Sequence, residues 1–418
     1  MVPTPTTDLA ADAIDFGDMT IWDRDDWPGM FAALRHDRPI SWHTEPEIPG
    51  LSLGPGPGFW SLVRYDDIVT ASRNPDVFIS GQGTNIPDFP PEVYEFLGSM
   101  INMDPPRHTR FRLIVNRGFT PRQVGAIEQS VHDRARSIVD AVAERGSCDF
   151  VSEIAAALPL AIICDMVGIP ESDYGLIFDK TNVVLGASDP EYGGEITAAF
   201  TAAQELWQYA QDLRADRLRH PRDDITTTIS QAEVDGHSLT PEEFGSFFVL
   251  LVAAGNETTR NAISHGMKAL TDFPDQRRRW LDDFDGISPS AVEEIIRWAT
   301  PVIHFRRTCV AQDVEISGTH FEEGQKVVLW YNSANRDEAS FDDPYQFDVT
   351  RQPNEHLGFG GGGPHFCLGA HLARREITVM FDELLRRLPD IEVTGEPEML
   401  RSNFIHGIKR MPVSFTPR

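Results

Sequence analysis

One cysteine of this chain is placed to do chemistry. Cys367 ends the glycine-rich run 356–366 and is followed by residues with a helical pattern. Glycines carry no side chain, so a flat ligand could approach the backbone here. A helix that begins just after Cys367 places its positive end near the sulfur and favours the thiolate, the form that binds metals. The residue and its setting therefore predict a metal ligand.

Three other interpretations of this stretch compete with that one. A phosphate-binding loop requires a Gly-Lys-Ser/Thr ending, which the run lacks. A structural zinc site needs four ligands in paired spacings, whereas Cys148, Cys164 and Cys309 stand singly. A buried structural thiol is the commonest role of a lone cysteine. The glycines around Cys367 and the motifs upstream argue against that role.

A second group of polar residues lies inside a long helix that we predict over 244–270. The segment Thr240-Pro241-Glu242-Glu243 is a good helix start, and the residues after it are apolar on every side. Residues 254–259 then place a carboxylate and two hydroxyls in mid-helix. The structural alternative is a kink, with threonine bonded to the preceding turn. A buried glutamate is costly without partners and commonly marks a working site.

These residues need a scaffold that positions them. With 418 residues and 41% hydrophobic residues, the chain can bury a large core. Apolar residues recur at helical spacing over 131–142 and 200–213, whereas strand-like segments such as 314–318 and 325–330 are few and short. We therefore predict a mainly α protein with small β-sheets. No linker divides the chain, so we expect one domain over 16–418 after a disordered segment over 1–15.

Composition limits the partners and the compartment. A formal net charge of −27 argues against binding to nucleic acid. The longest apolar run, 247–254, is far shorter than the roughly 18 residues that a membrane-spanning helix requires, so we expect no stable membrane anchor. Four unpaired-looking cysteines favour a reducing compartment. The first residues show no signal peptide, and the predicted location is cytoplasmic.

Further motifs are weak one by one, but their order along the chain is informative. Glu294 and Arg297 stand at i and i+3 of a helical stretch, which by itself indicates only a surface ion pair. They follow the helix over 244–270 and precede the segments 334–337 and 347–351, which lead to the Cys367 loop. In this order, from about residue 16 to the C-terminus, the motifs resemble those of the cytochrome P450 superfamily, the haem-thiolate monooxygenases.

The resemblance implies a single-domain cytochrome P450 fold in which haem b, iron protoporphyrin IX, lies between a long distal helix and the proximal Cys loop and helix. Cys367 would be the axial thiolate ligand of the haem iron. Glu294, Arg297 and Arg351 would form a buried, ion-paired triad that fixes the loop, a structural role. One spacing departs from the family pattern: Phe359 lies eight residues before Cys367 instead of seven, because one glycine is added.

The same resemblance assigns the haem contacts and the distal residues. Basic side chains would meet the haem propionates, which need cations when they are buried. Two small residues would leave room for O₂, and Thr258 and Glu257 would be the catalytic pair that passes protons to it. The residues assigned to cofactor binding are His108, Arg112, Arg307, His365, Phe359, Ala254 and Gly255.

Within the superfamily, the chain is most similar to actinobacterial enzymes that hydroxylate terminal carbons of methyl-branched or isoprenoid lipids and sterol side chains. The resemblance implies an apolar pocket suited to a hydrocarbon, with a mobile access loop over 82–100. Core packing is the alternative role for the pocket residues. These are Leu250, Ala253, Ala254, Ile303 and Phe404.

The resemblance also implies separate electron donors, a ferredoxin and its reductase, because no flavin or iron–sulfur segment is left over. His371, Arg374 and Arg375 would form a basic docking spot for an acidic ferredoxin, or a solvated helix face. Other functions stay open: peroxide-driven haem-thiolate oxidation, a steroid or terpenoid hydroxylase of other regiochemistry, and non-enzymatic haem or lipid binding. The pair at 257–258 argues against peroxide-driven oxidation and simple binding, because neither needs an O₂-activating proton relay.

Overall fold

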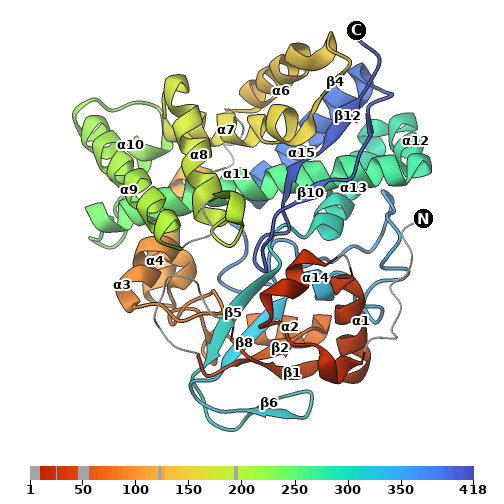
Figure 1. The fold of residues 1–418 in the computed structure, drawn as a ribbon. Helices are drawn as coiled ribbons and strands as arrows, with labels where there is room; N and C mark the ends of the chain where they lie inside the picture. The colour runs from red at the N-terminus through yellow and green to blue at the C-terminus, as the bar shows by residue number, and fades with distance from the viewer. Residues whose placement is uncertain (1–9, 25, 46–55, 121–124, 126, 193–195) are drawn as a thin grey trace.

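The computed structural model describes the chain apart from residues 1–9, 25, 46–55, 121–124, 126 and 193–195. Helices form the larger part of the molecule and a five-stranded sheet lies in the smaller part (Figure 1), which confirms the predicted fold class. No helix in these described ranges is both long and apolar enough to cross a bilayer. Besides the three helices described in the next paragraph, the α-helices of the described chain are α1 (Trp27–Asp37), α2 (Tyr65–Ser72), α3 (Pro91–Gly98), α4 (Arg107–Val115), α6 (Glu128–Ala143), α7 (Ala157–Val167), α8 (Tyr174–Leu185), α9 (Ile196–Arg219), α10 (Ile225–Ser230), α12 (Pro274–Asp282) and α14 (Tyr331–Ala334).

The predicted long helix forms as α11 (Pro241–Asp272), which runs through the middle of the helical part (Figure 1). A capping box sets its start: the Glu243 N–H donates to the Thr240 hydroxyl, and the Thr240 N–H donates to the Glu243 carboxylate. Helices α7, α8 and α9 pack against it, and so do α13 (Phe284–Ala299) and α15 (Ala370–Arg387). This surrounding explains why its sequence is apolar on every side.

The five-stranded sheet has the order β1 (Ile40–His43), β2 (Phe59–Leu62), β8 (Lys326–Trp330), β5 (His304–Cys309) and β3 (Phe78–Ile79). The two strand-like segments predicted over 314–318 and 325–330 do not pair with each other. Instead β6 (Val314–Ile316) pairs with β7 (Thr319–Phe321), while β8 joins β2 and β5. Ser317 and Gly318, with φ of 46° and 81°, make the tight turn that favours this pairing.

A short helix lies before Phe16. Residues 11–13 form a 3₁₀ helix, and Ala11 and Ile14 are buried in a cluster with Phe16 and Trp22. The disordered segment over 1–15 stays a prediction; within residues 10–15 the side chains of Ala11 and Ile14 are buried, whereas Ala10, Asp12 and Ala13 are exposed. The rest of that prediction, over residues 1–9, lies outside the described residues.

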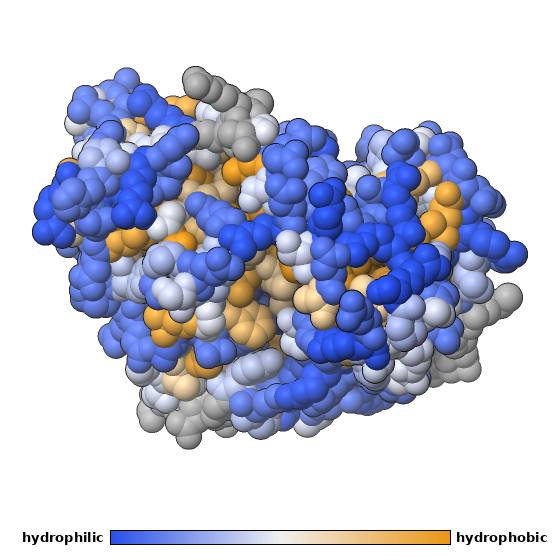
Figure 2. Space-filling model, turned by 90° about the horizontal axis from the view of Figure 1, so that it is seen from above, coloured by the Kyte–Doolittle hydropathy of each residue, from blue (hydrophilic) through white to orange (hydrophobic). Residues whose placement is uncertain are grey.

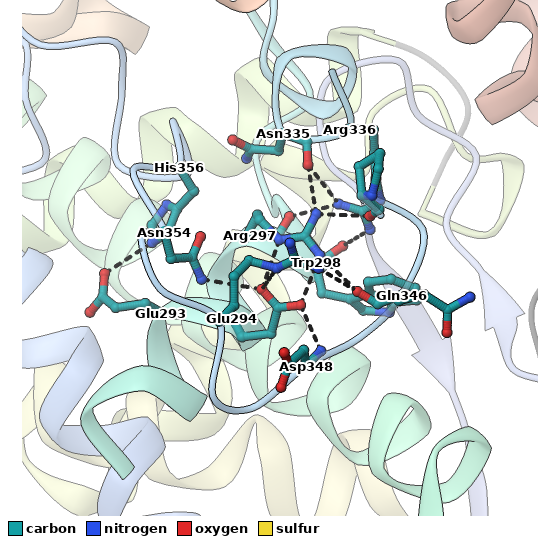
Figure 3. A network of polar contacts seen from close by, with 12 residues as sticks. Glu293, Glu294, Arg297, Trp298, Asn335, Arg336, Gln346, Asp348, Asn354 and His356 are labelled. Carbon is teal, nitrogen blue, oxygen red and sulfur yellow. Dashed lines mark hydrogen bonds and ion pairs between the residues drawn. The ribbon is translucent and has the colours of Figure 1, made fainter. Parts of the chain in front are cut away.

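A buried ion pair on α13 fixes the segment that leads to Cys367 (Figure 3). Arg297 donates to both carboxylate oxygens of Glu294, at 2.7 Å and 2.8 Å, and neither side chain is exposed. Arg351 Nε donates to the same carboxylate at 3.1 Å. The structure thus brings the three predicted triad residues together.

The Glu294–Arg297 pair also forms hydrogen bonds with backbone groups. Arg297 Nη1 donates to the carbonyls of Asn335, at 2.7 Å, and Pro344, at 2.9 Å. The Glu294 carboxylate accepts the Asp348 N–H at 2.9 Å. Charges in a protein interior are tolerated only when every group is satisfied in this way. The segment 335–351 is therefore anchored to α13 along its length.

The neighbouring residue Glu293 connects α13 to both ends of the Cys367 loop. His356 Nε2 lies 3.0 Å from its carboxylate, and Arg374 on α15 binds it at 2.5 Å and 2.9 Å. Burial acts to raise the pKa of Glu293, but His356 and Arg374 lower it to about 2. The carboxylate is thus ionised at neutral pH and holds the loop against its following helix.

Removal of the Glu294 carboxylate should destabilise the fold severely. Glu294→Ala leaves the Arg297 guanidinium buried without a counter-charge, and we expect the free energy of unfolding to fall by about 3–5 kcal/mol. Denaturant unfolding followed by far-UV circular dichroism measures this. Arg278→Ala is the matched control, because its pair with Asp275 is exposed and should be worth less than about 1 kcal/mol. Equal losses in the two variants would contradict the anchoring role.

Candidate active site

A cavity of about 670 Å³ lies between α11 and the Cys367 loop. Its wall contains Leu250, Ala254 and Thr258 of α11, opposite Phe359 and Cys367 of the loop. The space-filling view shows apolar residues in a hollow that is bordered by hydrophilic ones (Figure 2). The volume is in the range of small-molecule sites in proteins.

The glycines of the loop allow close packing and unusual backbone angles. Gly360, Gly362 and Gly363 have φ of 103°, 91° and 79°, a region that side chains disfavour. A Cβ on Gly363 would lie 2.6 Å from the Ser72 carbonyl oxygen. The Cys367 N–H closes the loop by donating to the Phe359 carbonyl at 3.0 Å. The run therefore has the conformation that its composition predicts.

Cys367 faces the cavity, and among the cysteines of the described chain it alone lines it. Its accessible surface is part of the cavity wall, and the protein around it keeps most bulk water away from the sulfur. Burial raises the pKa of the thiol, while the Gly369 backbone N–H and the Arg112 guanidinium act to lower it. The predicted helix-end effect is thus present but outweighed. A metal that coordinates the sulfur would deprotonate it outright.

Four basic side chains gather beside this loop. Arg307, on β5, is 6% exposed, and the rings of His108 and His365 lie 4.3 Å apart. Both nitrogens of His108 and Nε2 of His365 are buried without a hydrogen-bond partner. Arg112 donates hydrogen bonds to two loop carbonyls, that of Pro364 at 2.9 Å and that of Phe366 at 2.6 Å.

No carboxylate in the described part of the chain pairs with Arg307 or Arg112, whose pKa values are lowered by burial. Burial and the neighbouring Arg307 likewise lower the pKa of His365, to about 2. Buried cations without counter-charges are costly, so this cluster requires an anion. Together with the thiol and the side-chain-free loop, the cluster fits a flat, anionic, metal-bearing group.

Small and hydroxylated residues of α11 form the facing wall. Ala254, Gly255 and Thr258 line the cavity, and Thr258 Oγ1 donates to the Ala254 carbonyl at 2.8 Å. Among the predicted pocket residues, Leu250, Ala253 and Phe404 also line it. Thr258 thus bonds to the preceding turn of its own helix, as the structural alternative predicted, and it also lines the cavity. Both hold at once because the hydroxyl lies at the cavity surface.

Two predicted site residues lie elsewhere. Glu257 does not line the cavity; its carboxylate binds Arg260 and, at 3.0 Å, the Asn261 amide. Ile303 packs in the core cluster with Trp330, whereas its neighbours Val302 and His304 line the cavity. Successive side chains of an extended segment point to opposite sides, which explains this offset of one residue.

The structure adds cavity residues that the sequence did not reveal. Ile86 and Phe89, within the predicted access loop, line the cavity, and Asp88 between them is bound by Arg306 and Lys326, each at 2.7 Å. Glu376 on α15 also lines it. Glu376 could have been found from the sequence, because it is a carboxylate on the otherwise apolar, buried face of that helix.

Comparisons with known proteins agree with this geometry. The family model for cytochrome P450 matches residues 194–399. The chain is 50% identical to the methyl-branched lipid omega-hydroxylase of Mycobacterium tuberculosis, over 99% of this chain and 97% of that protein. The chain belongs to the cytochrome P450 family. This P450 is also 43% identical to a steroid C26-monooxygenase of Rhodococcus jostii, over 92% of this chain and 81% of that protein.

The solved structures agree as well. A Mycobacterium marinum cytochrome P450 in complex with pseudoionone superposes on this P450 with a TM-score of 0.92, at 44% identity, over 97% of this chain and 99% of that one. The enzyme is therefore a monooxygenase of the P450 type, and its cofactor is a thiolate-ligated haem. The residues around the cavity fit that cofactor: an anionic macrocycle supplies the counter-charge that the basic cluster lacks, and the loop supplies a sulfur.

The haem spectrum should depend on Cys367 and on no other cysteine. With carbon monoxide bound to the reduced protein, thiolate ligation shifts the Soret band strongly to the red. We expect this shift in the wild type and its loss in Cys367→Ser. Cys309→Ser is the matched control, because Cys309 is buried away from the cavity. A shift that persists in Cys367→Ser would rule out Cys367 as the ligand.

Proposed function

We propose that this P450 hydroxylates the terminal carbon of an apolar chain, in a methyl-branched or isoprenoid lipid or a sterol side chain. The observation that supports it most is the apolar cavity that ends at Cys367. The names of the two relatives, an omega-hydroxylase of methyl-branched lipids and a steroid C26-monooxygenase, point to the same class of substrate. The predicted cytoplasmic location stays a prediction.

The cavity walls select the substrate by shape. Leu250, Ala253, Phe89 and Phe404 present apolar surface, and each Å² of apolar substrate surface that leaves water contributes about 25 cal/mol. Such contacts have no direction, so they hold a hydrocarbon without choosing one carbon. The choice of the terminal carbon then depends on which end of the chain reaches the wall between Ala254 and Thr258.

The residues of the α11 wall leave space in the cavity and hold a proton at its surface. When bound, the haem supplies O₂ activation and the oxidation of an unactivated C–H bond. Ala254 and Gly255 keep side-chain bulk away from the centre of the cavity wall. Thr258 holds a proton at Oγ1, 2.8 Å from the Ala254 carbonyl, and rotation of this hydroxyl would present the proton to the cavity.

A ferredoxin and its reductase are the proposed electron donors. The predicted basic docking spot carries less free charge than the sequence suggests, because Arg374 pairs with Glu293 and Arg375 lies 3.0 Å from Glu128. The α4 surface is a further candidate, since Arg112 binds the carbonyls of the Cys367 loop and Leu113 beside it is 49% exposed. Both surfaces lie on elements that contact the loop.

Reconstitution should give terminal hydroxylation that depends on ferredoxin. The haem-loaded protein is incubated with ferredoxin, reductase, NADH and a methyl-branched fatty acid under ¹⁸O₂. Mass spectrometry should then find one labelled oxygen on the terminal carbon. A straight-chain acid of equal length and hydrogen peroxide without ferredoxin are the controls. Oxidation within the chain, or product from peroxide alone, would contradict the proposal.

Loss of the Thr258 hydroxyl should separate electron use from product formation. In Thr258→Ala the cavity wall no longer offers a proton at this position, and we expect product per NADH to fall by roughly tenfold or more. Thr258→Ser should retain coupling, because it keeps the hydroxyl. Thr271→Ala, on the same helix but away from the cavity, is the matched control. Wild-type coupling in Thr258→Ala would remove the assigned role.

A further inference from the structure

One arginine of the cavity wall has no role in the site described so far. Three arginines line the cavity in the described part of the chain, namely Arg112, Arg307 and Arg401. Arg112 and Arg307 belong to the basic cluster beside the Cys367 loop, where the haem supplies the counter-charge. Arg401 lies outside that cluster. Apolar walls hold a hydrocarbon without direction, so a polar group such as this one can determine the orientation of a ligand.

Arg401 extends from the cavity to the outer surface of the molecule. Its side chain is 34% exposed and lies 3.1 Å from the carboxylate of Asp23, which is 47% exposed and does not line the cavity. Asp23 ends the 3₁₀ helix Met19–Asp23, and Met19 at the other end of this helix does line the cavity. Arg401 therefore stands at the outer end of the cavity, beside solvent.

A buried carboxylate holds the backbone of Arg401 in place. The Arg401 N–H donates to Asp189 Oδ2 at 3.0 Å, and Asp189 is 2% exposed. Lys409, on β11 (Ile408–Arg410), lies 3.1 Å from the same oxygen and balances its charge. Ser188, next to Asp189 in the chain, also lines the cavity. The guanidinium thus starts from a fixed point of the cavity wall, as a recognition group requires.

The guanidinium of Arg401 has two nitrogens without a partner. Asp23 lies beside Nε, and neither Nη group makes a hydrogen bond within the described ranges. The neighbouring cations differ, because Lys409 and Arg410 both bind Glu191. An arginine with both Nη groups unbonded can bind a carboxylate through two parallel hydrogen bonds. Among these three cations, Arg401 is therefore the one that can take an anionic ligand without losing a partner.

We infer that Arg401 binds the carboxylate of a lipid acid at the outer end of the cavity, and that this contact turns the hydrocarbon terminus toward Cys367. The inference rests on the proposed function and narrows its substrate class to acids. A carboxylate accepts both Nη hydrogen bonds and carries the opposite charge, whereas an alcohol is neutral. The enzyme should therefore bind a lipid acid more tightly than the alcohol of the same skeleton.

Calorimetric titration of the haem-loaded protein tests this contact without turnover. A methyl-branched fatty acid and the alcohol of the same skeleton are titrated into the wild type and into Arg401→Gln. We expect the variant to bind the acid about tenfold more weakly, because charge-assisted hydrogen bonds are lost, and to bind the alcohol within about twofold of the wild type. Equal losses for both ligands, or no loss for the acid, would overturn the inference.

Two further variants separate a direct contact from a folding defect or a general effect of charge. Arg410→Gln removes a neighbouring positive charge that does not line the cavity, so the affinity for the acid should stay within about twofold. Asp23→Asn removes the carboxylate that competes for the guanidinium, so the acid should bind about two- to fivefold more tightly. The inference is wrong if Arg410→Gln loses as much as Arg401→Gln, or if the affinity does not rise in Asp23→Asn.

The position of the product tests the orientation. In the ferredoxin system the wild type should oxidise the acid at the terminal carbon. Arg401→Gln should distribute oxidation over several carbons, because apolar contacts alone do not fix which end reaches Cys367. Arg401→Lys keeps the charge without the paired donors and should give an intermediate distribution. An unchanged distribution in Arg401→Gln would remove the orienting role.

Failure of the proposed function gives a different result. If the wild type hydroxylates no lipid, the proposed function is wrong, and the titrations still decide whether Arg401 binds a carboxylate. If the wild type hydroxylates the terminal carbon but Arg401→Gln binds the acid as tightly, the function is kept and the inference is overturned.

Discussion

The buried ion pair of Glu294 and Arg297 is the interaction on which the site depends. At a water-exposed surface such a pair contributes little to the stability of a protein. In the interior, the free-energy cost of removing the two charges from water can exceed the attraction between them. Here its remaining bonds go to backbone groups of 335–351 and to Arg351. Any displacement of that segment would leave a buried charge unsatisfied. The segment continues into the Cys367 loop, so the position of the sulfur is determined by an interaction that takes no part in the reaction.

A second constraint is the excess of positive charge beside the loop. Arg307, Arg112, His108 and His365 converge without an ion pair to any carboxylate of the described residues; Asp104 acts on Arg307 and His108 only from beyond ion-pair distance. The polypeptide alone is therefore electrostatically incomplete here, and the bound haem is part of its stability as well as of its chemistry. Burial is the main reason that the pKa values of His108 and His365 lie below their ordinary value, and the positive charges of Arg112 and, for His365, of Arg307 lower them further.

The sequence carried the fold and the loop but not the orientation of individual side chains. The Cys367 loop and the helix α11 were predictable because glycine spacing and helical periodicity are local properties, whereas the Glu294 triad and the cavity role of α11 came from the resemblance to a known family. Ile303 was misplaced because a shift of one residue along an extended segment reverses the side that faces the cavity. The sequence also did not show that the Glu257 carboxylate binds Arg260, one turn later, instead of lining the cavity; its role in passing protons stays a prediction. Such choices depend on three-dimensional neighbours.

Glu257 and Glu376 show how three-dimensional neighbours give two similar carboxyls different partners. Glu257 stands beside Thr258 in the sequence, yet its charge is used by Arg260 and the Asn261 amide. To donate into the cavity it would have to leave a buried cation unpaired, which costs several kcal/mol. Glu376 is distant from the α11 motif in sequence but already faces the cavity, with a proton and without a cation. Arg260 also donates to the Asn182 side chain of α8 at 2.8 Å, so the pair that it forms with Glu257 connects α11 with α8.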